Sequence, residues 1–209
     1  MSTPKIFVIG DSISLQYGPH LAQMIAGRYE YGRKTGREEA LKDLDLPVGA
    51  NGGDSDRVLA YVQALRDGGD WKPDLALINC GLHDIKLPAD GGGDRQVPLD
   101  RYRTNLRTIV GMLGELGIGM VWIRTTPADE EVHDRHEKSF RRLAADVDAY
   151  NRAADEIMET AGVPAIDLFA FTRSLGGQEI FDDHVHFPEP IQKLQAAFIA
   201  GWLDRHFGG

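Results

Sequence analysis

The stretch IFVIGDSIS, residues 6–14, begins with four apolar residues and ends in a polar turn. The apolar run predicts a strand that is buried on both faces. The triplet Gly10-Asp11-Ser12 ends this strand, and apolar residues at helical spacing follow it as far as Ile25. A buried strand that leads directly into a helix is the repeating unit of a parallel α/β sheet.

The same alternation of strand and helix continues to the end of the chain. Further strands are predicted at residues 47–51, 74–79, 119–123 and 163–166, and further helices at residues 55–67, 99–116, 139–161 and 190–206. Five buried strands separated by helices predict a parallel five-stranded sheet with helices on both faces, which is a three-layer α/β/α fold. Because no repeat or low-complexity linker interrupts the pattern, residues 1–209 are expected to form a single domain.

Composition and charge narrow the classes of function. The chain has 209 residues, of which 42% are hydrophobic, and 23 Lys and Arg against 32 Asp and Glu give a formal net charge of -9. This composition suits a soluble globular protein, and the acidic balance argues against nucleic acid or an anionic membrane surface as a partner. The lone cysteine, Cys80, excludes an internal disulfide and a cysteine-rich metal site.

The N-terminal residues do not show the pattern of a signal peptide. No apolar segment approaches the roughly 20 residues that are needed to span a bilayer. A cytoplasmic location without a membrane span is therefore expected.

Three charged or glycine-rich segments fall outside the regular pattern: residues 28–46, 86–98 and 127–138. The second and third directly follow predicted strands. Loops after the carboxyl ends of parallel strands build the ligand site of an open sheet, so these two segments are expected on its rim. Solvent-exposed connectors are the alternative interpretation of each segment.

Ser12 lies where the first strand turns into the first helix. A hydroxyl at such a turn is exposed, and the backbone N–H of Ser12 lies near a helix N-terminus, where it can stabilise a developing oxyanion. The alternative is that Asp11 or Ser12 merely caps the helix.

A second group of candidates is the run Asp182-Asp183-His184-Val185-His186, which precedes the last predicted helix. A histidine acts as a general base to a serine when a carboxylate orients its ring and stabilises the imidazolium. Spacing alone does not decide which aspartate and which histidine would do so. An acidic loop with surface histidines is the alternative.

Two further loops follow strands that are predicted to be buried. Asn51-Gly52-Gly53 allows close approach of the backbone to a ligand, although, taken alone, a plain turn before a helix capped by Asp54 or Ser55 explains it better. The second loop, Gly81 to Asp84, places His83 just past a strand end. This histidine could be a base, a metal ligand, an oxyanion donor or a loop residue.

Taken in order, these four loops resemble the motifs of the SGNH (GDSL) hydrolase superfamily. Its blocks are matched by Gly10-Asp11-Ser12, by Gly53 followed by Asp54, by Gly81-Leu82-His83-Asp84 with histidine in place of the usual asparagine, and by Asp183 and His186 three residues apart. The resemblance spans nearly the whole chain and implies a flavodoxin-like sheet of SGNH-hydrolase type with strand order 2-1-3-4-5. The G-x-S-x-G elbow of the larger α/β-hydrolase family is absent.

The resemblance also implies roles for individual residues. Ser12 would be the nucleophile, His186 the general base and then acid, and Asp183 the carboxylate that orients it. The oxyanion hole would consist of the Ser12 N–H, the Gly53 N–H and the side chain of His83. No metal or organic cofactor is implied.

His83 is the departure from the family pattern. A neutral imidazole has one N–H donor, which could replace the amide of asparagine if the correct nitrogen carries the hydrogen. The alternatives are a contact with substrate, with two backbone N–H groups left to serve the oxyanion, and a structural histidine in a hydrolase of low activity.

The sequence thus predicts a serine esterase that works through an acyl-enzyme and takes a small-molecule ester. The expected rim is polar, which favours short-chain O-acetyl esters on a carbohydrate, with Asp11, Asp84, Lys86 and His133 as candidate substrate contacts. The alternatives are an acyl-thioester or lysophospholipid hydrolase with the same triad, and a binding module with little or no turnover. The oligomeric state is left open.

Overall fold

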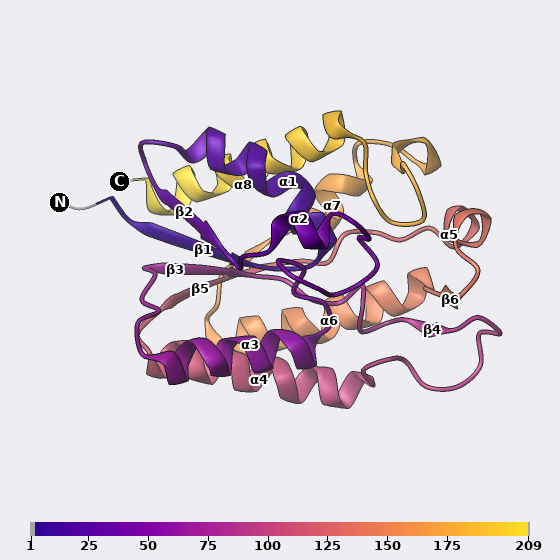
Figure 1. Ribbon diagram of the computed structural model, residues 1–209, viewed down its shortest axis with the longest axis horizontal. Helices are drawn as coiled ribbons and strands as arrows, with labels where there is room; N and C mark the ends of the chain where they lie inside the picture. Colours follow the sequence, from indigo (N-terminus) through magenta and orange to yellow (C-terminus); the bar gives the residue numbers. More distant parts are fainter. Residues whose placement is uncertain (1–2, 209) are drawn as a thin grey trace.

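The computed structural model describes residues 3–208 and contains a sheet that lies between two layers of helices (Figure 1). Its strands are β1 (Lys5–Ile9), β2 (Glu30–Arg33), β3 (Leu75–Ile78), β5 (Gly119–Ile123) and β7 (Ala165–Ile166). All neighbouring strands are parallel, in the order β2-β1-β3-β5-β7. Numbered within this sheet alone, the order is 2-1-3-4-5, so the predicted topology and the three-layer α/β/α fold are confirmed.

Two groups of helices cover the sheet. Figure 1 shows α1 (Ser12–Ile25), α7 (Leu168–Arg173) and α8 (Glu189–Phe207) on one face, and α3 (Ser55–Gly68), α4 (Leu99–Glu115) and α6 (Ala144–Ala161) on the other. The central strand β3 is buried at every position, and Trp122 of β5 is fully enclosed. Apolar faces of the helices therefore meet both sides of the buried central strands, and this burial is the main driving force for the fold.

The second strand is not where the sequence placed it. Residues 47–51 form a loop, whereas β2 lies within the charged segment 28–46 that was expected to be irregular. The reason is that β2 is an edge strand, partly covered, with the polar sequence EYGR. Apolar periodicity detects strands that are buried, so an edge strand of this kind leaves little signal.

The helix predicted at residues 139–161 begins only at Ala144. The residues before it form β6 (Phe140–Arg141), which pairs antiparallel with β4 (Leu87–Pro88). Together with α5 (Glu130–His136), these two short strands make an arm beyond the carboxyl ends of the sheet, on the right of Figure 1. The two segments expected as rim loops thus carry regular structure. The remaining short elements are α2 (Arg37–Ala40) and the 3-10 helix η1 (Gln178–Ile180).

None of the helices within residues 3–208 combines the length and the apolar character that crossing a membrane requires.

Candidate active site

Ser12, His186 and Asp183 form a chain of polar contacts at the carboxyl edge of the sheet. The Oγ of Ser12 lies 2.8 Å from Nε2 of His186, and Nδ1 of the same ring lies 2.7 Å from Oδ2 of Asp183. Ser12 comes from the turn after β1, while the other two residues come from the loop before α8. The fold thus joins two segments from opposite ends of the chain.

The start of α1 accounts for the position of Ser12. Asp11 is the N-cap residue, and its Oδ1 accepts a hydrogen bond of 3.0 Å from the Ile13 N–H. Ser12 is the first residue of the helix, so its own N–H has no carbonyl acceptor within that helix. Asp11 therefore caps the helix while the adjacent Ser12 keeps an N–H without a partner in that helix, so the two alternatives left by the sequence are compatible.

In the loop before α8, Asp183 and His186 are the aspartate and the histidine that join Ser12. Oδ1 of Asp183 accepts the backbone N–H groups of Val185 and His186 at 2.9 and 2.8 Å, so the carboxylate is held against its own loop. Burial opposes ionisation of Asp183, but the hydrogen bond and charge of His186 together with these N–H groups lower its pKa below the usual value. Asp182 is exposed, and His184 turns toward a different segment of the chain.

The glycine loop before α3 lies directly against the turn that carries Ser12. The Gly52 N–H donates to the Gly10 carbonyl at 2.9 Å, and a Cβ on Gly52 would lie only 2.9 Å from that oxygen. The Gly53 N–H, expected to face the oxyanion, donates at 3.0 Å to Oδ1 of Asn51. Asn51 is held by its amide group, which donates to two loop carbonyls, so this donor already has an acceptor within its own turn.

His83 lies in the same region and is 2% exposed. Burial, followed by the charges of Lys86 and Arg142, lowers its pKa well below the usual value, so the ring is neutral. Within residues 3–208, Nδ1 of His83 is enclosed and has no hydrogen-bond partner.

Two of the expected substrate contacts, Asp84 and Asp11, face the protein interior. Asp84 is fully buried, and its two carboxyl oxygens accept the Ser55 N–H at 2.9 and 3.1 Å, which ties the His83 loop to the start of α3. Asp11 is 1% exposed and caps α1. Because burial removes both carboxyl groups from solvent, their position does not suit direct contact with a substrate.

The other two expected contacts lie on the arm. His133 is also fully buried, with Nε2 3.0 Å from the Phe140 carbonyl and its ring packed against Phe140 and His184. Its burial argues against substrate contact as well. Lys86 is half-buried, and its Nζ donates to the Asp45 carbonyl and lies 4.2 Å from the centre of the Phe140 ring. Burial and the charge of Arg142 lower the pKa of Lys86 to about 8.

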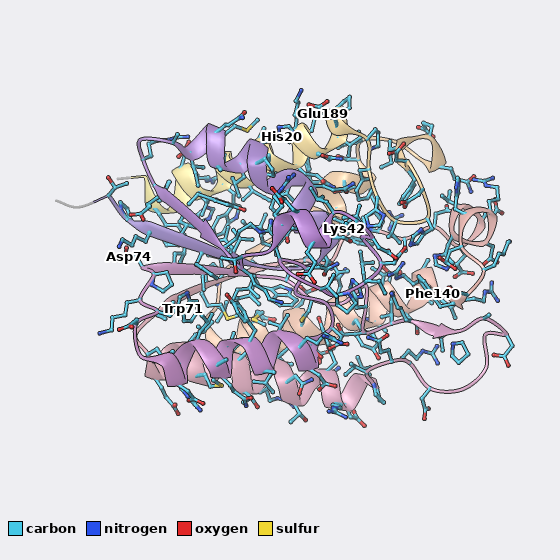
Figure 2. The ribbon with its side chains drawn as sticks, in the orientation of Figure 1. His20, Lys42, Trp71, Asp74, Phe140 and Glu189 are labelled. Atoms are coloured by element: carbon cyan, nitrogen blue, oxygen red, sulfur yellow. The ribbon has the colours of Figure 1, made fainter. Side chains whose placement is uncertain are left out.

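Sequence reasoning missed Arg142 and Asp45. Arg142 is 2% exposed, its Nε donates to the Leu82 carbonyl at 2.7 Å, and its Nη2 lies 3.5 Å from Asp45 Oδ1. Arg142 fell inside the predicted helix 139–161, and Asp45 inside a charged segment that looked solvent-exposed. The contact between Arg142 and Asp45 joins the end of the arm to the loop after α2, and Phe140 and Lys42 mark these two segments in Figure 2.

Among the described residues, Asp183, His184 and His186 are the one group whose potential metal-ligating atoms lie within 4.8 Å of one another. Asp183 and His186 are already bonded to each other, and His186 also contacts Ser12. The triad hydrogen bonds account for the closeness of Asp183 and His186, and His184 joins the group through its Nδ1, which lies 3.4 Å from Asp183 Oδ1.

Comparison with known proteins bears on the family and the fold. The model of the GDSL-like Lipase/Acylhydrolase family matches residues 8–193. No curated protein sequence matches the chain.

Several solved structures share the fold. A lipase/acylhydrolase from Enterococcus faecalis superimposes with a TM-score of 0.72 at 20% identity, over 97% of this chain and 96% of that one. An acetyl xylan esterase gives a TM-score of 0.66 at 15% identity, with coverages of 95% and 99%. A mutant acetyl-xylooligosaccharide esterase from Geobacillus gives 0.66 at 17% identity, with coverages of 100% and 95%.

The family match covers most of the chain, so the chain belongs to the GDSL-like lipase/acylhydrolase family. It is a carboxylic ester hydrolase, as the order of its sequence motifs predicted.

Proposed function

We propose that Ser12, His186 and Asp183 hydrolyse a carboxylic ester through an acyl-enzyme. The observation that carries this proposal is the unbroken series of contacts from Ser12 Oγ to His186 at 2.8 Å and from His186 to Asp183 at 2.7 Å. His186 removes the hydroxyl proton as Ser12 attacks the ester carbonyl, and then passes that proton to the departing alcohol. In the second half of the reaction His186 removes a proton from water, which attacks the acyl group and frees Ser12.

The oxyanion that forms during each attack needs hydrogen-bond donors. We assign this role to the Ser12 N–H and to Nε2–H of His83, because Nδ1 of His83 is the enclosed nitrogen and the ring is neutral. His83 would then act where the family has asparagine. Gly53 contributes its N–H only if its bond to Asn51 is shared or broken.

A short acyl group suits the access to the nucleophile. Ser12, His83 and His186 are only 2–3% exposed, so little room for substrate lies open above Ser12. Lys86 of the arm donates to the carbonyl of Asp45, whose carboxylate contacts His184, so a polar and charged side chain lies near this region and suits a hydroxyl-rich alcohol. We therefore favour O-acetyl esters of a carbohydrate, a substrate class also named for two of the structures with this fold.

One observation favours longer acyl chains, as in a thioester or lysophospholipid. Leu41, Leu46 and Val48 are 42%, 52% and 36% exposed, and all three lie on the loop that carries Asp45. They are exposed apolar side chains on a loop that reaches His184 through Asp45, and the sequence pattern alone did not suggest them. The limited access to Ser12 favours a short acyl chain and these apolar side chains favour a long one, so measured selectivity decides between the two.

Covalent labelling with a fluorophosphonate tests the nucleophile. We expect the wild type to be labelled, Ser12→Ala to lose labelling and at least about a thousandfold in kcat/KM, and Ser55→Ala to be labelled normally. Ser55 is the matched control because it ends the second Gly-Asp-Ser triplet of the chain. An unlabelled wild type would instead indicate a binding module.

The substrate class is tested with acetyl, butyryl and longer p-nitrophenyl esters beside an acetylated xylo-oligosaccharide. The proposal requires the highest kcat/KM on acetyl esters. A higher value on long-chain esters would reject it in favour of the lysophospholipid or thioester alternative.

A further inference from the structure

The buried guanidinium of Arg142 lies beside the loop of residues 81–86, which carries His83. Arg142 follows β6 of the arm, is 2% exposed and is among the largest buried side chains of the protein. A charged group loses its hydration when it is buried, so it is found in a protein interior only where other groups compensate for that loss. The contacts of this guanidinium therefore have to replace water.

The closest of these contacts is with the backbone just before His83. Nε of Arg142 donates to the Leu82 carbonyl at 2.7 Å, a short distance that is typical of a charge-assisted hydrogen bond. Nη2 lies 3.5 Å from Oδ1 of Asp45, and the guanidinium carbon lies 4.8 Å from the centre of the Phe140 ring. The carboxylate and the ring thus limit rotation of the planar guanidinium and keep Nε directed at the carbonyl.

The Leu82 carbonyl depends on Arg142 for a donor. Leu82 is 1% exposed, so this oxygen is shielded from water. Within residues 3–208, Arg142 supplies the one hydrogen bond that the oxygen accepts. A buried carbonyl without a donor is unfavourable, so loss of the Arg142 side chain would favour rotation of this peptide toward another donor.

Rotation of that peptide would move His83. The amide group between Leu82 and His83 is planar, so the direction of the Leu82 carbonyl fixes the direction of the His83 N–H and the point from which its side chain starts. On the other side of His83 the loop is already fixed, because the Lys86 N–H donates to the His83 carbonyl at 3.3 Å and Asp84 binds the start of α3. The peptide before His83 is held by Arg142 instead.

We propose that Arg142 is a positioning residue that acts through the Leu82 carbonyl and directs Nε2–H of His83 at the oxyanion. The inference deepens the proposed hydrolysis and rests on it. Among the described residues, the polar contacts of Arg142 are with Leu82 and Asp45, so its effect on the rate reaches the reaction through His83. A displacement of about 1 Å can lower a rate roughly a hundredfold, so this one contact of the arm is sufficient to affect turnover.

A direct effect of the positive charge of Arg142 on the oxyanion is the alternative. Nη1 is enclosed and has no hydrogen-bond partner within residues 3–208. Burial and the charges of Lys86 and Arg142 lower the pKa of His83, so this charge does reach the oxyanion donor. A direct effect would persist without His83 and would be retained by lysine, whereas positioning requires both His83 and the Nε donor.

A double-mutant cycle tests whether Arg142 acts through His83. We expect Arg142→Met to lower kcat on an acetyl ester by roughly 10- to 100-fold with little change in KM, because a displaced donor weakens binding of the transition state alone. In the His83→Ala background the same substitution should change kcat by less than about twofold, since no donor is left to position. An equal loss in the two backgrounds would overturn the inference, and so would a wild-type kcat in Arg142→Met.

Arg142→Lys tests whether the charge alone is sufficient, and it also covers the case in which Arg142→Met does not fold. Lysine keeps a positive charge beside Asp45 but has no donor at the position of Nε, so we expect kcat to fall at least about tenfold, again only when His83 is present. A wild-type kcat in Arg142→Lys would overturn the inference in favour of direct stabilisation by the charge. Thermal unfolding of each variant sets a temperature at which all of them are folded and can be compared.

Arg141→Met is the matched control on the same strand. The Arg141 guanidinium pairs with Asp134 inside the arm, at 2.7 and 3.2 Å. Its substitution removes an arginine and an ion pair but leaves the Leu82 carbonyl bonded, so kcat should stay within about twofold of the wild type. Equal losses in Arg141→Met and Arg142→Met would indicate a general effect of the arm and would contradict the inference. Labelling of Ser12 in the wild type tests the proposed hydrolysis separately, so the two failures are distinguishable.

Discussion

Histidine at position 83 can act as a hydrogen-bond donor only if its surroundings fix the hydrogen on the correct ring nitrogen, whereas asparagine has no such requirement. An amide always presents N–H donors, whereas a neutral imidazole presents one, and only from the nitrogen that carries the hydrogen. Burial and the neighbouring charges of Lys86 and Arg142 keep the His83 ring neutral by lowering its pKa. The role of this residue therefore depends on which of its nitrogens is protonated, a choice that no sequence motif specifies.

Substitution of His83 tests its role as an oxyanion donor. His83→Asn should retain much of the activity, because the amide restores a donor, whereas His83→Ala should lower kcat roughly a hundredfold or more. Steady-state kinetics on an acetyl ester measure both effects, and His136→Ala, an exposed histidine, is the control. An alanine variant as active as the wild type would reject the donor role.

At the scale of elements, close contacts between loops bring the site together. Gly52 touches the turn after β1, Asp84 accepts the first N–H of α3, and Arg142 of the arm binds the Leu82 carbonyl. Each contact joins segments that are distant in sequence. Substitutions at these points should therefore disturb the site even though the residues contact no substrate.

Two glycines give a matched comparison of this effect. Gly52→Ala should lower both stability and activity, because its Cβ would lie 2.9 Å from the Gly10 carbonyl oxygen. Gly111→Ala should raise the free energy of unfolding by about 0.5–1 kcal/mol, because Gly111 lies inside α4 and a Cβ there meets nothing within 4 Å. Urea unfolding with the ester assay measures both, and equal stability of the two variants would contradict this account.

At the scale of the whole molecule, parallel strands place the loops that follow them at one edge of the sheet. Strands β1 and β3 are neighbours, so the turn with Ser12 and the loop with His83 lie side by side. The loop before α8 reaches the same edge because α8 packs along α1. Half-buried carboxylates with lowered pKa values gather there, which makes the stability of the fold depend on pH.

Asp45 and Asp183 contribute stability that is lost in acid, whereas burial raises the pKa values of Asp11 and Asp84, which act in the opposite direction. Burial opposes the ionisation of Asp45 and Asp183, but the hydrogen bonds and charges of His184 and His186 lower both pKa values in the folded protein. A lowered folded-state pKa stabilises the protein above the unfolded value of about 3.9, and this stability is lost as the pH falls below that value toward the folded pKa. Thermal unfolding should thus show a fall in Tm below about pH 4, with a smaller fall in Asp45→Asn. An identical fall in that variant would exclude Asp45 as a contributor.

The sequence by itself determined the α/β class, the parallel order of the strands, the family and the motif residues Ser12, Asp183 and His186. Each of these features depends on a short stretch of sequence. Burial of a strand on both faces produces an apolar run, and each motif lies within one turn. Apolar periodicity did not predict the edge strand β2 or the strands of the arm, because a half-exposed segment can form a strand without an apolar pattern.

Only the tertiary structure decided which side chains surround the motifs. It placed Arg142 and Asp45 at the site, turned Asp84 and His133 inward, and gave the Gly53 N–H an acceptor in Asn51. These outcomes depend on contacts between distant segments, where packing, desolvation and charge are set jointly by residues that no local pattern connects.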